Sequence, residues 1–163
     1  LFSRQYDYPV HLGVTEAGTV LRGAVKSAVG LGILLNEGIG DTLRVSLTAG
    51  VKEEVKAGFE ILKALGLRRH GVNLISCPTC GRTEIDLVNL VDRGESYVEK
   101  INKPITVAVM GCVVNGPGEA READVGVAGG KGMGVLFVKG KVVKTVKESE
   151  LFPELKKLID SVV

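Results

Sequence analysis

The sequence of 163 residues has no tryptophan, and its aromatic residues amount to only 4%. Proteins that bind single-stranded nucleic acid need aromatic side chains for stacking and a clustered basic surface. Here the formal net charge is +2, and the lysines and arginines are spread along the chain. The composition therefore argues against a nucleic-acid-binding protein.

Long apolar runs are also missing. A membrane-spanning helix needs about 20 consecutive apolar residues, whereas the richest run here, residues 31–35, is short and has glycines at positions 30 and 32. The first residues carry no signal-peptide pattern and do not begin with methionine. We expect a protein without a membrane contact, present here as the C-terminal part of a longer chain.

Cysteine is scarce, with three residues in all. An odd and small number gives no disulfide framework, which favours a reducing, cytoplasmic setting. The chain is 45% hydrophobic and 25% charged, as in globular proteins, and its length suits one ordinary domain or two small ones.

The first part of the chain alternates strands with helices. A strand over residues 9–14 precedes a helix over 19–36, and a strand over 43–47 precedes a helix over 51–65. This order predicts parallel strands with right-handed crossovers. Barrel and open α/β folds place their sites at the C-terminal ends of such strands. The polar residues at these ends are Thr15, Glu16 and Ser46.

Residues 68–71 interrupt this alternation, and we place a domain boundary there, giving domains 1–70 and 71–163. The second domain has an α+β pattern. Thr83 is expected to cap a helix, with Asp86 in a capping box and an interruption at Gly94. Hairpin turns are expected at 129–134 and 139–140. The remaining predicted elements are strands over 72–76, 105–110, 125–128 and 135–138 and a helix opened by Pro153.

The three cysteines form the one pattern that indicates chemistry. Cys77 and Cys80 share a C-x-x-C segment after one predicted strand, and Cys112 follows another. Four alternatives are open: a zinc site completed by His70 or His11, a redox dithiol, unliganded buried thiols, and an iron–sulfur cluster. Strand ends hold thiolates still, and loop N–H groups can point at the sulfur atoms, so the cluster is the favoured interpretation.

Glu119 adds a possible fourth ligand seven residues after Cys112. Three thiolates leave one iron of a cubane cluster with a different ligand, and a carboxylate is displaced more easily than a thiolate. Without a longer motif, a solvated loop carboxylate is the more ordinary interpretation of Glu119. Asn115 has the pattern of a turn residue, and Lys26 that of a solvated helix lysine.

Long motifs decide between these alternatives. The chain resembles the family of 4-hydroxy-3-methylbut-2-enyl diphosphate synthases, the iron–sulfur enzymes of isoprenoid biosynthesis by the methylerythritol phosphate route. The segments that carry the resemblance are 11–18 (HLGVTEAG), 23–28 (GAVKSA), 37–47 (EGIGDTLRVSL), 75–82 (ISCPTCGR) and 111–120 (GCVVNGPGEA).

The resemblance implies the last βα units of a TIM barrel, followed by a small α+β domain with a [4Fe–4S] cluster. It implies a substrate pocket lined by Thr15, Glu16 and Ser46, with Glu16 as the acid/base residue and Asn115 in contact with substrate beside the cluster. The implied cluster ligands are Cys77, Cys80, Cys112 and Glu119.

The resemblance also implies partners. The substrate is 2-C-methyl-D-erythritol 2,4-cyclodiphosphate, whose ring is opened in a two-electron reduction fed by ferredoxin or flavodoxin. The implied assembly is a homodimer in which the cluster domain of one subunit closes over the barrel of the other.

The main departure from the family lies at the front of the chain, where two strands stand in place of a whole barrel. We therefore expect the isolated chain to bind a cluster but to turn over little or no substrate. Two interpretations of another class remain open: a zinc-stabilised structural or binding module, and an iron–sulfur module that only transfers electrons.

Overall fold

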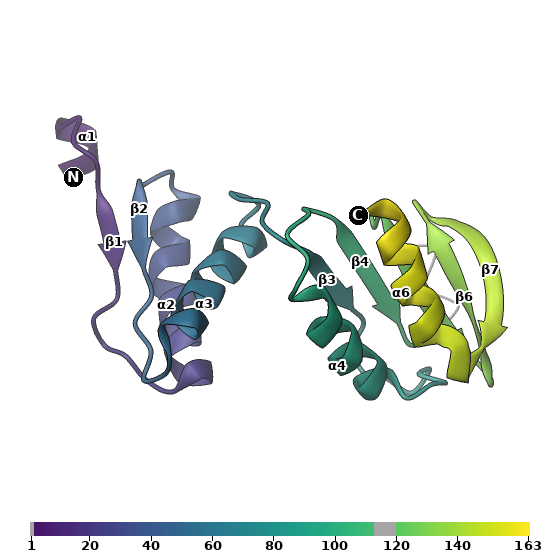
Figure 1. The fold of residues 1–163 in the computed structure, drawn as a ribbon. Helices are drawn as coiled ribbons and strands as arrows, with labels where there is room; N and C mark the ends of the chain where they lie inside the picture. The colour runs from purple at the N-terminus through teal and green to yellow at the C-terminus, as the bar shows by residue number, and fades with distance from the viewer. Residues whose placement is uncertain (1, 113–119) are drawn as a thin grey trace. The chain divides into compact units, whose positions relative to one another are not determined.

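The computed structural model describes residues 2–112 and 120–163 (Figure 1). The chain forms two compact units, Leu1–Arg69 and His70–Val163. In the described part of the chain, every helix is too short or too polar to cross a membrane. Each unit is described below by itself.

The first unit contains the two predicted βα repeats. β1 and β2 pair in parallel, with Leu12 opposite Leu43, which confirms the predicted parallel arrangement. Both strands are shorter than expected, because pairing covers only three residues of each. The elements are α1 (Phe2–Gln5), β1 (His11–Gly13), α2 (Val20–Asn36), β2 (Thr42–Arg44) and α3 (Val51–Ala64).

One side of this two-stranded sheet is covered by α2 and α3, and a small core lies between them (Figure 1). The outer surface of α2 is apolar as well: side chains four residues apart are 55–76% exposed at Leu21, Val25, Val29 and Ile33. Exposed apolar rows of this length on one helix are unusual for a surface that faces water alone. The buried core residues are Leu12, Leu31, Val45, Leu47 and Ile61.

The second unit is a mixed sheet of five strands in the order β3-β4-β5-β6-β7. The first three strands are parallel and the last two antiparallel. This is the α+β arrangement predicted for the second part of the chain. The elements are β3 (Asn73–Ser76), α4 (Leu87–Val98), β4 (Thr106–Met110), β5 (Val125–Gly130), β6 (Met133–Val138), β7 (Lys141–Lys147), η1 (Glu148–Glu150) and α6 (Leu151–Val162).

Two helices, α4 and α6, cover one face of this sheet (Figure 1). Alternation along β4 and β5 turns Val107, Val109, Val125 and Val127 toward the helices. Ala108 and Met110 face the other side, where they pack with Phe137, Ala120 and Ala123. The central strands β4 and β5 are therefore buried on both faces, as is usual for parallel strands.

The two predicted hairpin turns are confirmed. The last residue pair of β5 and β6 is Gly130 with Met133, so the turn in the glycine-rich stretch consists of Lys131 and Gly132. Lys139 and Gly140 connect β6 to β7 with φ angles of 46° and 73°. Such positive angles at both central residues are those of the tight turn that matches the twist of paired strands.

The predicted start of α4 is wrong by three residues. Asp86, not Thr83, is the N-cap, and its Oδ1 accepts a hydrogen bond from Asn89 N–H at 3.3 Å. Asp86 N–H also donates to Glu148 Oε1 at 3.0 Å, which anchors the helix start on η1. The predicted interruption at Gly94 is wrong too, since the helix continues to Val98. Gly94 is buried on the packed face of α4, and a Cβ there would make only an ordinary contact with Leu74.

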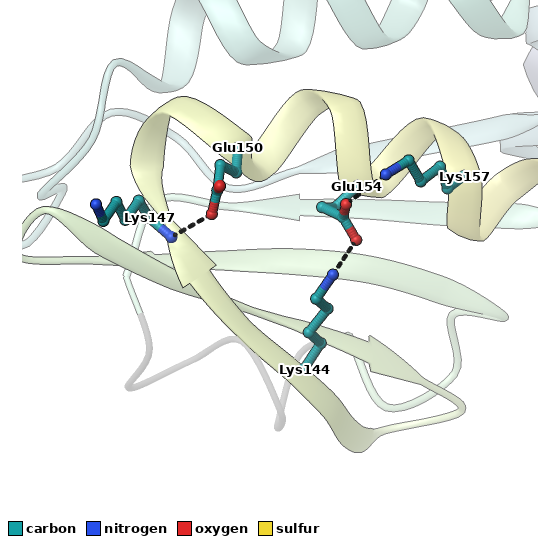
Figure 2. A network of polar contacts seen from close by, with 5 residues as sticks. All are labelled: Lys144, Lys147, Glu150, Glu154 and Lys157. Atoms are coloured by element: carbon teal, nitrogen blue, oxygen red, sulfur yellow. Dashed lines mark hydrogen bonds and ion pairs between the residues drawn. The ribbon is translucent and has the colours of Figure 1, made fainter.

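An ion-pair network fastens α6 to the edge strand β7 (Figure 2). Glu154 on α6 binds Lys144 of β7 at 2.5 Å and Lys157 of its own helix at 2.7 Å. The hydrogen bond from Lys144 is the largest cause that lowers the pKa of Glu154. The ion pairs of Glu154 therefore stabilise the folded state at pH values above the pKa of a glutamate in the unfolded chain. This contribution is lost as the pH falls through the lowered pKa of Glu154 in the folded state.

We expect Gly126→Ala to destabilise the second unit by about 1–3 kcal/mol, the usual cost of overpacking. A Cβ at this position would lie 2.4 Å from Phe137 Cζ and 2.5 Å from the Ala108 carbonyl oxygen. Urea unfolding followed by circular dichroism measures the change, because the chain has no tryptophan to serve as a fluorescent probe.

Gly94→Ala is the matched control. Its added Cβ would lie 4.0 Å from Leu74 Cδ1, an ordinary contact, and alanine is the better helix former by about 1 kcal/mol. We expect this variant to be as stable as the parent chain or more so. Equal destabilisation of both variants would contradict the packing argument for Gly126.

Candidate functional site

Two of the predicted ligands, Cys77 and Cys112, follow neighbouring parallel strands. The pairing of Ser76 with Val109 places the ends of β3 and β4 side by side. Gly111 N–H donates a hydrogen bond to Cys77 Sγ at 3.1 Å, directly before Cys112 in the chain. The Cys112 side chain is only 6% exposed, whereas Cys77 is half-buried. The fold thus brings residues 77 and 111–112 together although they are more than thirty positions apart.

Cys80 lies in the exposed turn that continues from Cys77. The turn is closed by Thr83, whose Oγ1 accepts a hydrogen bond from Cys80 N–H at 3.1 Å. Hydrogen bonds from Arg82, first from its backbone and then from its side chain, lower the pKa of the Cys80 thiol. A lowered pKa favours the thiolate, which is the form that binds metals.

The donor chemistry fits an iron–sulfur cluster. Three free thiols and an N–H···S hydrogen bond are the groups that hold and tune such clusters. In the described ranges, no three His, Cys, Asp or Glu side chains converge on one point as ligands of a single metal ion do. Cysteines of a cubane cluster need not converge in that way, because each binds a different iron. Glu119 and Asn115 lie outside the described residues.

The three polar residues predicted in the first unit follow β1 and β2 at the same edge of the sheet. Thr15 and Glu16 come after β1, and Ser46 comes two residues after β2 ends. The two loops are joined by a hydrogen bond from Thr48 N–H to the Gly18 carbonyl at 2.7 Å. The structure therefore brings both predicted segments to one end of the strand pair, as the carboxyl ends of parallel strands require.

Glu16 is paired with a residue that the sequence pattern places among solvated lysines. Lys26 on α2 donates to Glu16 Oε1 at 2.5 Å, and the two side chains are 42% and 82% exposed. The hydrogen bond from Lys26 is the main cause that lowers the pKa of Glu16, and its charge acts in the same direction. At neutral pH Glu16 is therefore a carboxylate, able to accept hydrogen bonds or a proton.

Arg44 is a second neighbour that no pattern in the sequence singles out. It is the last residue of β2 and pairs with Gly13 of β1. A Cβ at Gly13 would lie 3.0 Å from Arg44 Nη2, so the missing side chain leaves room for the guanidinium to cross the strand pair. Arg44 Nη2 then donates to Thr15 Oγ1 at 3.3 Å. The strand-end site thus holds two cations, Arg44 and Lys26, beside the predicted polar residues.

We expect Lys26→Met to raise the pKa of the Glu16 carboxyl toward that of an ordinary glutamate, because the donor and the charge that lower it are both removed. The measurement is a carboxyl ¹³C NMR titration. Since the folded-state pKa is lowered, the contribution of this pair to stability is present at neutral pH and is lost as the pH falls through that pKa.

Lys52→Met on α3 is the control, because it removes an equal charge elsewhere in the same unit. The Lys52→Met variant should leave the pKa of Glu16 unchanged. An unchanged Glu16 pKa in the Lys26→Met variant would show that the ion pair does not form in solution.

Comparison with known proteins adds the family. Residues 1–59 match the family described as the GcpE TIM-barrel domain, and residues 73–161 match the GcpE protein C-terminal domain. The predicted order of barrel units followed by a second domain is confirmed in this coarse form.

Individual relatives agree with this assignment. The chain is 62% identical over 161 residues to a Clostridium acetobutylicum protein and 60% identical over 151 residues to a Geobacter sulfurreducens protein. Both are named 4-hydroxy-3-methylbut-2-en-1-yl diphosphate synthase (flavodoxin). The matches cover 99% and 93% of this chain but 46% and 43% of the relatives, so the chain spans about half their length. With one family domain matched on each of its units, the chain belongs to the GcpE protein family.

Proposed function

We propose that this chain is part of a reductive iron–sulfur enzyme of isoprenoid biosynthesis, which converts 2-C-methyl-D-erythritol 2,4-cyclodiphosphate to 4-hydroxy-3-methylbut-2-enyl diphosphate. The ring C–O bond to phosphate breaks, and the diphosphate stays attached at its other end. A second carbon loses its hydroxyl oxygen as water. Two electrons and two protons balance this change, and the electrons come from flavodoxin, the donor named for the relatives.

The observation that carries this proposal is the hydrogen bond from Gly111 N–H to Cys77 Sγ. It joins the two cysteine-bearing strand ends, each of which lies in a segment of family resemblance, 75–82 and 111–120. Structural thiols without a ligand have no need of such a donor, whereas thiolates that bind iron are regularly supported by backbone N–H groups.

In the proposed site, Cys77, Cys80 and Cys112 hold a [4Fe–4S] cluster, with Glu119 as the fourth ligand. When bound, the cluster supplies electrons and a Lewis-acidic iron that a substrate oxygen can reach. The residues around the cysteines support this set of ligands. Arg82 lowers the pKa of the Cys80 thiol and so favours its thiolate form, and burial of Cys112 keeps water from one side of the ligand set.

The strand-end residues of the first unit bind and orient the substrate in this proposal. Thr15 and Ser46 offer hydroxyls, Arg44 offers a guanidinium suited to phosphate, and Asn115 contacts the substrate beside the cluster. Glu16 is the proton-handling residue. Because Lys26 engages Oε1, the other oxygen, Oε2, is the atom left to accept a proton from a substrate hydroxyl and to return one to the leaving oxygen.

A barrel of the TIM type has eight βα units, and the residues matched to the barrel domain contain two. The exposed apolar row of α2 supports further barrel units packed against it. The diphosphate-binding groups implied by the resemblance then lie on those units, and the implied homodimer and the cytoplasmic setting stay predictions.

Anaerobic incubation of the chain with iron and sulfide should give a brown protein with about four irons per chain, the content of a cubane cluster. Cys112→Ser should abolish the chromophore, because a buried ligand is lost. Glu119→Ala should leave a cluster that chelators remove faster, since a carboxylate completes the set. Iron analysis and the visible spectrum measure both effects.

Thr79→Ser is the control for these variants, because it changes a residue between the two turn cysteines without touching a proposed ligand. It should take up iron like the parent chain. Stoichiometric zinc with no iron uptake would instead establish the zinc-stabilised module.

The isolated 163-residue chain should show little or no turnover of the cyclic diphosphate, since the larger part of the barrel is not in it. Turnover is measured by product formation with a reduced flavodoxin. Robust activity would contradict the expectation. A substrate-induced change in the spectrum of the cluster in the longer protein separates the enzyme from a pure electron-transfer module, which binds no substrate.

A further inference from the structure

The turn between Cys77 and Thr83 is held closed from both sides by one residue. Thr83 Oγ1 accepts a hydrogen bond from Cys80 N–H at 3.1 Å, and Thr83 N–H donates to the Cys80 carbonyl at 3.0 Å. The backbone of Cys80 is thus bound twice to the same threonine. Its thiol is exposed, so this pair of hydrogen bonds, rather than packing, fixes the backbone from which the sulfur projects. The sulfur itself is hydrogen-bonded by Arg82 and by the Thr83 side chain.

The same threonine lies against the segment that carries Cys112. A Cβ added to Gly111 would be 3.0 Å from Thr83 Cγ2 and 3.1 Å from Thr83 Oγ1. The neighbouring Glu84 N–H donates to the Gly111 carbonyl at 3.0 Å. Gly111 in turn donates its N–H to Cys77 Sγ. A side chain at position 111 would crowd Thr83, so the glycine lets the two segments approach closely.

We propose that Thr83 is a positioning residue that fastens the Cys80 turn to the Gly111–Cys112 segment and thereby holds the three thiols in place for the cluster. The inference rests on the proposed function. Thr83 is not itself a ligand: it acts through the backbone of Cys80, through a side-chain hydrogen bond to the Cys80 thiol and through contact with Gly111. Supporting residues of this kind orient the ligands and tune the metal, and their loss typically weakens metal binding about 10- to 100-fold.

The two parts of the threonine side chain have separate roles, which makes the inference testable. The hydroxyl accepts from Cys80 N–H, and the methyl group fills the space beside Gly111. Thr83→Val keeps the shape and removes the acceptor, whereas Thr83→Ser keeps the acceptor and removes the methyl group. The pair therefore separates hydrogen bonding from packing at one position.

The experiment uses the full 163-residue chain in both metal-free and reconstituted forms. In the metal-free Thr83→Val variant, hydrogen exchange at the Cys80 amide should be about fivefold faster, as expected for the loss of one ordinary hydrogen bond. After reconstitution with iron and sulfide, a chelator should remove the cluster about tenfold faster than from the parent chain. The midpoint potential of the cluster should also shift, because its surroundings have changed.

Thr83→Ser is the conservative variant and should stay within about twofold of the parent chain in amide exchange and in cluster lifetime, since one ordinary hydrogen bond is retained. Circular dichroism and urea unfolding establish that both variants fold alike. A shift in midpoint potential in the Thr83→Val variant, with the parent potential kept in the Thr83→Ser variant, indicates a positioning role. A general loss of stability would not produce this difference between the two variants.

Each contrary outcome has a definite meaning. A Thr83→Val variant that matches the parent chain in exchange, lifetime and potential overturns the inference and leaves the proposed function standing. Equal damage by serine and valine overturns it as well, because the hydroxyl is then not the active group. A parent chain that takes up no iron and sulfide overturns the proposed function, and the role of Thr83 toward the cluster with it.

Discussion

The parallel pairing of β3 with β4 is the interaction on which the cysteine site depends. Register places Ser76 opposite Val109, and this sets Cys77 beside Gly111 where both strands end. A shift of one residue would turn Val107 and Val109 away from α4 and α6 and turn Ala108 toward them, so packing on both faces of β4 fixes the register strongly. The geometry of the thiols is in this sense a consequence of valine packing beneath α4 and α6.

Close backbone approaches support that packing. Gly126 lies beneath Phe137, and Gly134 would place a Cβ 2.6 Å from Leu151 Cδ2. Gly129 leaves room for Ile85, which precedes α4 and follows the cysteine turn. These glycines stand inside strands, where glycine is otherwise unfavourable, and the contacts they permit connect β5 and β6 to the segment that carries the site.

Much of this arrangement is predictable from the sequence. The βα alternation, the helix beginning at residue 20, the hairpin at Lys139 and Gly140 and the strand-end placement of Cys77 all follow from periodicity and turn residues. The start of α4 does not, because both Thr83 and Asp86 are good caps. What decides between them is tertiary: the Thr83 hydroxyl is already occupied by Cys80 N–H, while Asp86 is anchored by Glu148. The contacts of Lys26 and Arg44 with the strand-end residues are not predictable either, because they too depend on tertiary structure. A solvated cation and a paired cation look alike in a sequence.

In both units the candidate site residues follow the ends of parallel strands. The two units differ in how firmly these residues are held in place. Glu16 is 82% exposed and its partner Lys26 42%, so their attraction acts through water and is screened by salt. Cys112 is buried, Gly111 N–H donates to Cys77 Sγ, and backbone hydrogen bonds join Thr83 to Cys80 and Glu84 to Gly111. In the function we propose, a proton-handling Glu16 would benefit from the first environment, because substrate could displace Lys26 at low cost. The proposed cluster ligands would benefit from the second, because they have to keep a metal centre in place. The two environments therefore agree with the proposed division of proton handling and metal binding between the units.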